Sequence, residues 1–243
     1  MLNRKDNKKK PLYHVKKNKI ANDFPDITDA LKNPNGLLAI GGDLNKIILL
    51  NAYKKGIFPW YSEGEPIMWW SPNPRCILKP YKIHISHSLK KSLRKKLFEI
   101  TFNKNFIDVI NECSAKRNHE SRSNLAVNDT WITSDVKKAF ISLHKSGYAH
   151  SVECWYNGEL VGGLYGIAMG KIFFGESMFS RMSNTSKITL IYLAKRLKEM
   201  NFKLIDCQVK SNHLITLGAQ LIKRKKFSKI LAVYCDYSKS VFE

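Results

Sequence analysis

The chain contains 243 residues, 44% of them hydrophobic, and carries a formal net charge of +21 at pH 7. It is long enough to bury a real hydrophobic core, either in one large domain or in a main domain with a small partner. No apolar run reaches the roughly 18 residues of a membrane-spanning helix, and no apolar stretch follows the Lys-rich N-terminus to make a secretory signal. We therefore expect a soluble, cytoplasmic and monomeric protein that makes no use of a membrane.

The positive charge gathers at three places along the chain. Residues 1–22 are basic, polar and without pattern, which predicts a disordered tail. An acid-free stretch at 79–96 and a second cluster at 223–229 fall on segments that we expect to be structured. Such clusters indicate docking surfaces for the phosphates of a nucleic acid. A Lys-rich genome is the alternative explanation for the overall excess.

Residues 23–75 are expected to form a small N-terminal domain. Within it, residues 24–57 are interpreted as a compact helical unit in which Asn45 caps a helix that ends at Gly56. Residues 57–75 contain four prolines, which exclude a regular helix, and three tryptophans. The tryptophans form either an aromatic corner between two domains or a surface on which nucleotide bases stack.

Residues 76–243 are expected to form the main domain. The segment up to 147 is predicted to contain a strand, a basic connection and two helices, the second of them capped by Thr133. A polar stretch at 117–129 between these helices is expected to be an exposed loop. The dipeptide Asn157-Gly158 is a strong signal for a type I′ hairpin.

From residue 151 onwards, segments appear in which apolar and polar residues alternate, as is typical of β-strands. The strands are predicted over residues 151–156, 159–169, 171–179 and 204–209, with a helix at about 184–200 before the fourth strand. A short helix at Gly218-Ala219 and a strand-like run at Ile230–Cys235 complete the chain. The order strand–strand–strand–helix–strand predicts an α/β (α+β) fold with N-acetyltransferase-like, or GNAT-like, topology.

Three polar side chains interrupt the apolar strands. Strand periodicity places Glu176 on the same face as Phe174 and Met178, and it places Asp206 and Gln208 together on one face of the fourth strand. Each carboxylate alone could be explained by a salt bridge or by capping. Three such groups on two strands that flank one helix favour a site, because buried carboxylates are costly unless they are paired or functional.

The sequence lacks the features of several other sites. No G-x-S-x-G nucleophile elbow is present, and residues 181–187 contain no glycine for a CoA pyrophosphate loop, which argues against an acetyl-CoA-dependent enzyme. The five cysteines are scattered, form no C-x-x-C pair and show no grouping with histidines, so we expect neither a metal nor another cofactor.

Seven motifs, in order, resemble those of the leucyl/phenylalanyl-tRNA–protein transferase family. They span about residues 24–228 and lie at 34–43, 56–60, 69–75, 130–133, 162–166, 175–181 and 204–208. The resemblance implies transfer of Leu or Phe, with Met as a further donor residue, from aminoacyl-tRNA to the N-terminal Arg or Lys of acceptor proteins, which marks them for N-degron proteolysis. A related tRNA-dependent ligase with a different amine acceptor, or a basic protein that only binds, remains the alternative.

The resemblance also implies roles for individual residues. Asp206 and Gln208 correspond to a proton-relay pair that activates or orients the attacking amine, and Glu176 corresponds to a glutamate near the reacting ends. Trp60 and Trp131 match aromatics near the 3′ adenosine of the tRNA. The pocket for the Leu or Phe side chain would be lined by Leu164, Phe173, Met178, Leu190, Leu193 and Ile205. The basic cluster that would hold the acceptor stem is Lys90, Lys91, Arg94, Lys95 and Lys96.

Five features depart from the family pattern, and one of them is the extended basic N-terminus. The 117–129 stretch is longer than usual, Asp129 replaces a common glycine, and Lys223 replaces a usual proline. Leu193 stands where an aromatic residue can occur, which would loosen the preference for Leu over Phe. None of these departures touches the three polar residues.

Overall fold

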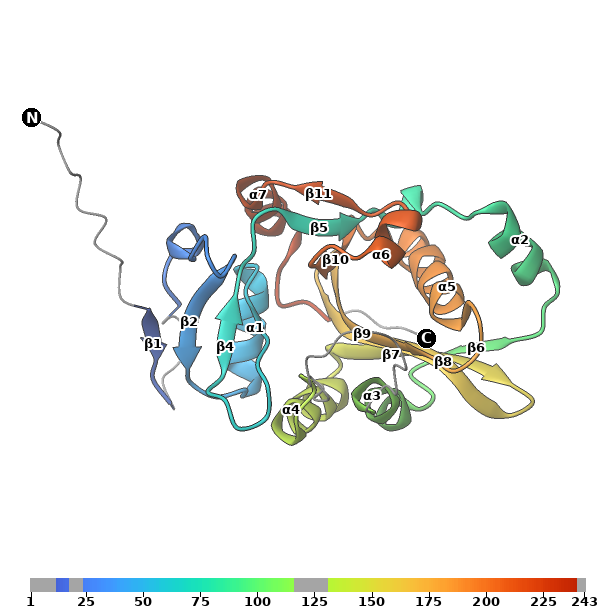
Figure 1. The fold of residues 1–243 in the computed structure, drawn as a ribbon, viewed down its shortest axis with the longest axis horizontal. Coiled ribbons are helices and arrows are strands. Elements are labelled where there is room, and N and C mark those ends of the chain that lie inside the picture. The colour runs from blue at the N-terminus through green and yellow to red at the C-terminus, as the bar shows by residue number, and fades with distance from the viewer. Residues whose placement is uncertain (1–11, 18–23, 116–130, 240–243) are drawn as a thin grey trace, which may run out of the picture.

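The computed structural model describes residues 12–17, 24–115 and 131–239. These residues build two β-sheets (Figure 1). The smaller has the strand order β1-β2-β4-β3, and the larger has the order β11-β5-β10-β9-β8-β7-β6. Most of the predicted disordered tail and the whole 117–129 stretch lie outside the described residues.

The smaller sheet and one helix form the N-terminal unit. Its elements are β1 (Tyr13–Val15), a 3-10 turn (Ile27–Asp29), β2 (Leu37–Gly41), α1 (Lys46–Lys54), β3 (Phe58–Pro59) and β4 (Met68–Trp70). The Asn45 side chain accepts a hydrogen bond from the backbone N–H of Ile48 and caps α1 as predicted. The expectation of a compact helical unit is wrong in part, because the apolar run that begins at Leu37 pairs with β4 as a strand.

Two further findings correct the picture of this unit. Tyr13–Val15, inside the predicted tail, forms a strand that runs parallel to β2. Among the tryptophans, Trp69 is fully buried and packs edge-on against Phe24, whereas Trp60 is exposed. One part of the cluster is therefore core, and another part is available to a ligand.

The larger sheet contains the main-domain strands. They are β5 (Arg75–Leu78), β6 (Glu99–Phe102), β7 (Ala149–Tyr156), β8 (Glu159–Met169), β9 (Ile172–Ser180), β10 (Leu204–Gln208) and β11 (Gln220–Ile222). Strands β7, β8 and β9 form an antiparallel meander, and β10 then pairs parallel to β9. This is the predicted GNAT-like order, and the α/β fold class is confirmed. At the β7–β8 turn, Asn157 and Gly158 both have positive φ, as a type I′ hairpin requires.

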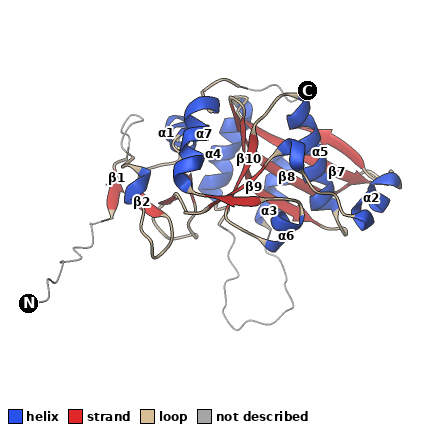
Figure 2. Ribbon diagram, turned by 90° about the horizontal axis from the view of Figure 1, so that it is seen from above, coloured by secondary structure: helices blue, strands red, loops and turns tan. Residues whose placement is uncertain are grey.

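The helices lie on both faces of the larger sheet (Figure 1), and Figure 2 shows the same elements from above. They are α2 (His87–Arg94), α3 (Phe106–Ser114), α4 (Ser134–Lys145), α5 (Thr185–Glu199), α6 (Asn212–Thr216) and α7 (Arg224–Tyr234), with a 3-10 turn at Pro80–Lys82. Thr133 caps α4 as predicted. The expected basic connection after β5 instead contains α2 and β6. No described helix has the length and apolar character to cross a bilayer.

Two predictions near the C-terminus are wrong. The expected short helix at Gly218-Ala219 ends two residues earlier, as α6. The run Ile230–Cys235, expected to be a strand, belongs mostly to helix α7. Phe227, Leu231 and Cys235 follow one another at four-residue spacing and are all buried, so a helical face decides the structure over the local preference of the apolar run.

The core forms two clusters separated by the larger sheet. One, beneath α5, contains Leu164, Phe173 and Leu193. The other joins the N-terminal unit to the opposite face of the sheet and contains Tyr53 and Phe174, whose ring centroids are 5.1 Å apart. Helix α7 closes against the end of α1 at Gly56, where a Cβ would lie 3.0 Å from the Phe227 ring. The two units therefore share this second cluster.

Candidate functional site

A cavity of about 870 Å³ opens at the boundary of the two units, within the usual size range of ligand pockets. Its lining comes from β3, β8, β9 and β10, from α5 and α6, and from the segments before α4 and after α3. Seven of the eight predicted substrate-binding residues line it: Trp60, Trp131, Leu164, Phe173, Met178, Leu190 and Leu193. Ile205 packs in the cluster beneath the cavity floor and is not part of the lining.

The cavity exists because β9 and β10 diverge. The two strands pair only over Leu204–Asp206 against Ile172–Phe174. Beyond that point β9 continues to Ser180 along β8, while β10 ends at Gln208. The wedge between them carries Glu176 on one side and Gln208 on the other, and both side chains line the cavity.

A β-bulge at Glu176 sets the direction of the β9 side chains. Tyr165 pairs with Ser177, but the next residue of β8, Gly166, pairs with Gly175, so Glu176 is the extra residue. Phe174 and Met178 consequently pack into different core clusters on opposite faces, and the prediction that they share a face is wrong. Gly166 is required at this point, because a Cβ there would lie 2.2 Å from the Phe174 carbonyl oxygen.

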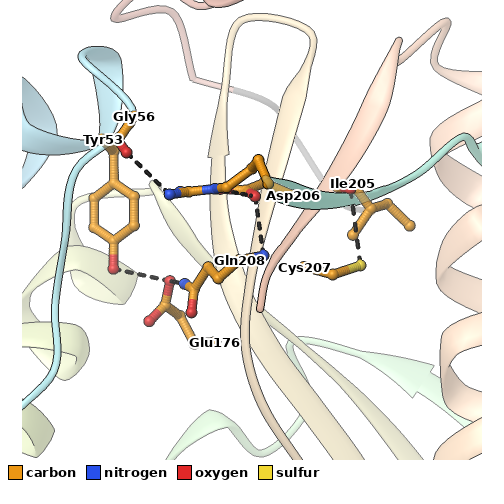
Figure 3. Close-up of polar contacts among 8 residues, drawn as sticks. Tyr53, Gly56, Glu176, Ile205, Asp206, Cys207 and Gln208 are labelled. Atoms are coloured by element: carbon orange, nitrogen blue, oxygen red, sulfur yellow. Dashed lines mark hydrogen bonds and ion pairs between the residues drawn. The ribbon is translucent and has the colours of Figure 1, made fainter. Parts of the chain in front are cut away.

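Glu176 receives two hydrogen bonds on one oxygen. The Tyr53 hydroxyl donates to Oε1 at 2.8 Å and the Gln208 amide donates to the same atom at 2.9 Å (Figure 3). The second oxygen, Oε2, is shielded from water and has no hydrogen-bond partner among the described residues. Burial raises the pKa of the Glu176 carboxyl to about 8; the Asp206 carboxylate adds to that rise, and the two hydrogen bonds oppose it.

Asp206 lies behind this pair and is not part of the cavity lining. Its side chain is fully buried and forms a two-pronged ion pair with Arg75, with Nε–Oδ1 at 2.8 Å and Nη2–Oδ2 at 2.6 Å. Oδ1 also accepts the backbone N–H of Gln208 at 3.0 Å. The structure thus brings Glu176 and Gln208 together at the cavity wall and places Asp206 one layer deeper.

Sequence reasoning missed two members of this network, Arg75 and Tyr53. Arg75 ends the 69–75 motif, and nothing in the sequence indicates its burial, because arginines are seldom fully buried. Tyr53 belongs to α1 of the N-terminal unit, 123 residues away from Glu176 in the chain. No local pattern in the sequence links such distant residues.

Cys207 is a further reactive side chain on the cavity wall. A hydrogen bond with the neighbouring Cys76 thiol, together with burial, raises its pKa well above the usual value for cysteine. The thiol therefore stays protonated at neutral pH and is a poor nucleophile. No group of three or more potential metal-binding side chains occurs within the described ranges.

The predicted basic cluster lies apart from the cavity. Its five residues, Lys90, Lys91, Arg94, Lys95 and Lys96, are exposed on α2 and just after it, and none lines the cavity. Leu89 holds α2 against the cluster beneath α5. Helix α2 stands at the opposite end of the molecule from the N-terminal unit (Figure 1). A long polyanion could touch this helix while its end reaches the cavity.

Comparison with known proteins covers both units. The family model described as leucyl/phenylalanyl-tRNA protein transferase matches residues 77–232, and the model of its N-terminal domain matches residues 42–73. A leucyl/phenylalanyl-tRNA–protein transferase of Cellvibrio japonicus is 50% identical over 214 residues, 88% of each chain. One of Pseudomonas aeruginosa is 51% identical, over 88% of this chain and 92% of that one.

Likeness to solved structures is slight. A GCN5-related N-acetyltransferase from Kribbella flavida aligns with a TM-score of 0.32 at 8% identity, over 70% of this chain and 58% of that one, and it carries no functional argument. The two family models and the curated relatives, by contrast, extend over nearly all the described elements. This chain belongs to the leucyl/phenylalanyl-tRNA–protein transferase family.

Proposed function

We propose that the protein moves Leu or Phe, and also Met, from aminoacyl-tRNA to the α-amine of proteins that begin with Arg or Lys. The product would then enter N-degron proteolysis. The observation that carries the proposal is an apolar cavity with a polar wall of Glu176 and Gln208, in a chain whose relatives are named for this activity. Since charged tRNA is a cytoplasmic substrate, we expect the enzyme to act there.

The cavity suits the end of a charged tRNA. Leu164, Phe173 and Leu193 supply an apolar floor for the Leu or Phe side chain. Trp60 is 45% exposed and, with Trp131, lines the cavity, where the two rings can stack on the terminal adenine. The exposed lysines of α2 would neutralise phosphates of the acceptor stem.

The reaction replaces an ester bond with an amide bond. The acceptor amine attacks the ester carbonyl, the new N–C bond forms, and the C–O bond to the ribose breaks. The amine loses a proton in this exchange and the ribose oxygen gains one. A carboxyl group whose pKa is about 8 can accept the first proton and return it to the leaving oxygen near neutral pH, and Glu176 is such a group.

The ester is already activated, so direct attack needs no covalent enzyme intermediate. The neutral thiol of Cys207 supports this route, because it is a weak competitor for the carbonyl carbon. Gln208 holds the Glu176 carboxyl through its amide N–H and leaves its own carbonyl oxygen to orient the incoming amine.

The test is a transfer assay with labelled Leu-tRNA and Phe-tRNA. We expect label to appear on peptides that begin with Arg or Lys, and not on the same peptides when the α-amine is acetylated. A peptide that begins with Ala serves as the control for acceptor choice. Transfer to another amine, with none to the Arg and Lys peptides, would favour the alternative ligase.

A further inference from the structure

We infer that Arg75 is a positioning residue of this enzyme and that Asp206, its partner, holds Gln208 in place instead of taking the proton. The inference rests on the proposed function and refines the roles within its site. It departs from the expectation that Asp206 and Gln208 act together as a proton relay.

Both oxygens of Asp206 already accept hydrogen bonds. Oδ2 accepts from the Arg75 Nη2, and Oδ1 accepts from both the Arg75 Nε and the backbone N–H of Gln208. The side chain is fully buried and does not line the cavity. A substrate amine in the cavity would have no path to these oxygens unless the ion pair opened.

The guanidinium of Arg75 is held in place and cannot move away if its partner Asp206 is neutralised by a proton. The guanidinium is 1% exposed and lies between the rings of Phe58 and Phe227, with its central carbon 4.8 Å and 4.7 Å from their centroids. Its Nη1 donates to the Gly56 carbonyl oxygen at 3.1 Å. If Asp206 accepted a proton, this buried cation would lose its counter-charge, which is strongly unfavourable. Asp206 is therefore poorly placed to take the proton of the acceptor amine.

The backbone conformation of Gln208 depends on Asp206. Its φ is +61°, in the left-handed region that a residue with a side chain seldom occupies, and the register of β10 against β5 shifts at this point. The bond from its N–H to Asp206 stabilises that conformation. The same conformation directs the Gln208 amide to Glu176. Arg75 thus fixes the position of Asp206, and Asp206 fixes that of Gln208. Gln208 in turn holds the Glu176 carboxyl.

Two variants separate positioning from proton transfer. The double variant Arg75→Gln/Asp206→Asn removes both charges but keeps an amide donor opposite an amide oxygen, and it removes any base at position 206. The single variant Arg75→Lys keeps the Asp206 carboxylate and a positive charge but cannot reproduce the two-pronged contact. Each is measured for kcat, for KM toward charged tRNA and for the pH profile, with thermal melting as the check on folding.

We expect the double variant to lose about tenfold in kcat, because its amide pair holds the Gln208 N–H less firmly, and to keep the pH profile of the wild type, because no base has been removed. We expect Arg75→Lys to lose at least about tenfold in kcat, while KM stays the same, because only the geometry of the reacting groups is disturbed. If Asp206 is the base, the results reverse. The double variant then loses about 10² to 10⁴-fold and Arg75→Lys stays close to wild type, which overturns the inference.

The single variant decides the question if the double variant does not fold. A folded Arg75→Lys protein with wild-type kcat would overturn the inference by itself, and reduced kcat with unchanged KM would support it. Each rate is expressed relative to the wild-type rate in the same assay. Failure of the proposed function is distinct, because the wild type itself would then transfer nothing to the Arg and Lys peptides.

Discussion

The cavity wall and helix α2 use charge in opposite ways. At the wall Glu176 is half-buried, and behind it Asp206 and Arg75 are fully buried. All three have hydrogen-bond partners within 3 Å, so a small displacement changes which atoms meet. On α2, five basic side chains are exposed. Their effect depends on their number and on the salt concentration, because exposed charges are screened. Substitution should therefore act on rate at the first region and on affinity at the second.

The sharpest contrast is expected from Glu176→Gln. We expect kcat to fall about 10² to 10⁴-fold, because the group that accepts and returns the proton is lost, while affinity for charged tRNA is retained. The acceptor amine also titrates near pH 8. Below that pH, log kcat of the wild type should therefore rise by about two for each pH unit, because two groups must lose a proton. In the variant it should rise by about one, because only the amine titrates.

The measurement is single-turnover transfer from pH 5.5 to 9, run beside tRNA binding. Glu199→Gln, the same change at an exposed position on α5, is the matched control. An unchanged dependence on two protons in Glu176→Gln would assign the titration to another group.

Helix α2 should show the reverse behaviour. Neutralising Lys90, Lys91, Arg94, Lys95 and Lys96 together should weaken tRNA binding on the order of tenfold to a hundredfold. The slope of log K against log salt should fall by up to about 0.9 for each lysine that contacts a phosphate. Transfer at saturating tRNA should be almost unaffected.

The matched control neutralises the second basic cluster, at the start of α7 and just before it: Lys223, Lys225, Lys226 and Lys229 are also exposed. Equal slope changes in the two variants would mean that net charge alone drives binding. If the salt slope changed only in the variant of the second cluster, the docking surface would lie on α7 instead of α2.

The apolar floor is expected to control selectivity by a smaller amount. Leu193 is 1% exposed and lines the cavity, so Leu193→Ala should enlarge the space for the donor side chain. We expect the ratio of kcat/KM for Phe-tRNA over Leu-tRNA to rise about tenfold, the usual scale for a few methylene groups in an apolar pocket. Leu197→Ala is the control, because Leu197 is buried one turn later on α5 and does not line the cavity. A ratio that shifts equally in both variants would indicate general loosening of α5.

A different kind of effect concerns the pH dependence of stability at the cavity wall. The pKa of Glu176 is about 8 in the folded protein against an ordinary value of 4.5, so the folded state binds the proton more tightly. Between those values the wild type should lose about 1.4 kcal/mol of unfolding free energy per pH unit relative to Glu176→Gln, which does not titrate. Urea unfolding at pH 5, 6.5 and 8 measures the difference. Parallel pH dependence of the two proteins would show that folding does not raise the pKa of Glu176.

Sequence reasoning succeeded where structure is determined by neighbours in the chain. Asn157-Gly158 produced the expected hairpin, since positive φ at both positions is a local property. Asn45 and Thr133 cap their helices through their own side chains. The alternation of β7, β8 and β9 gave the meander, and the ordered motifs gave the family.

It failed where distant residues decide. The bulge at Glu176 depends on how β8 and β9 align, and period-two counting cannot detect an extra residue. The apolar run in α7 is helical because Phe227 and Leu231 pack against α1 near Gly56. Asp206 was expected at the reacting centre, and its burial behind Gln208 depends on Arg75, 131 residues earlier in the chain.

The contact of Phe227 with Arg75 also bears on how the enzyme becomes active during synthesis. A nascent chain that has emerged through β10 already contains Arg75, Asp206 and Gln208. It lacks α7, the last described element, and with it one of the two rings that enclose the guanidinium. The reacting centre is therefore completed only after nearly every other described element has been made, so a chain that ends before α7 should have no transfer activity.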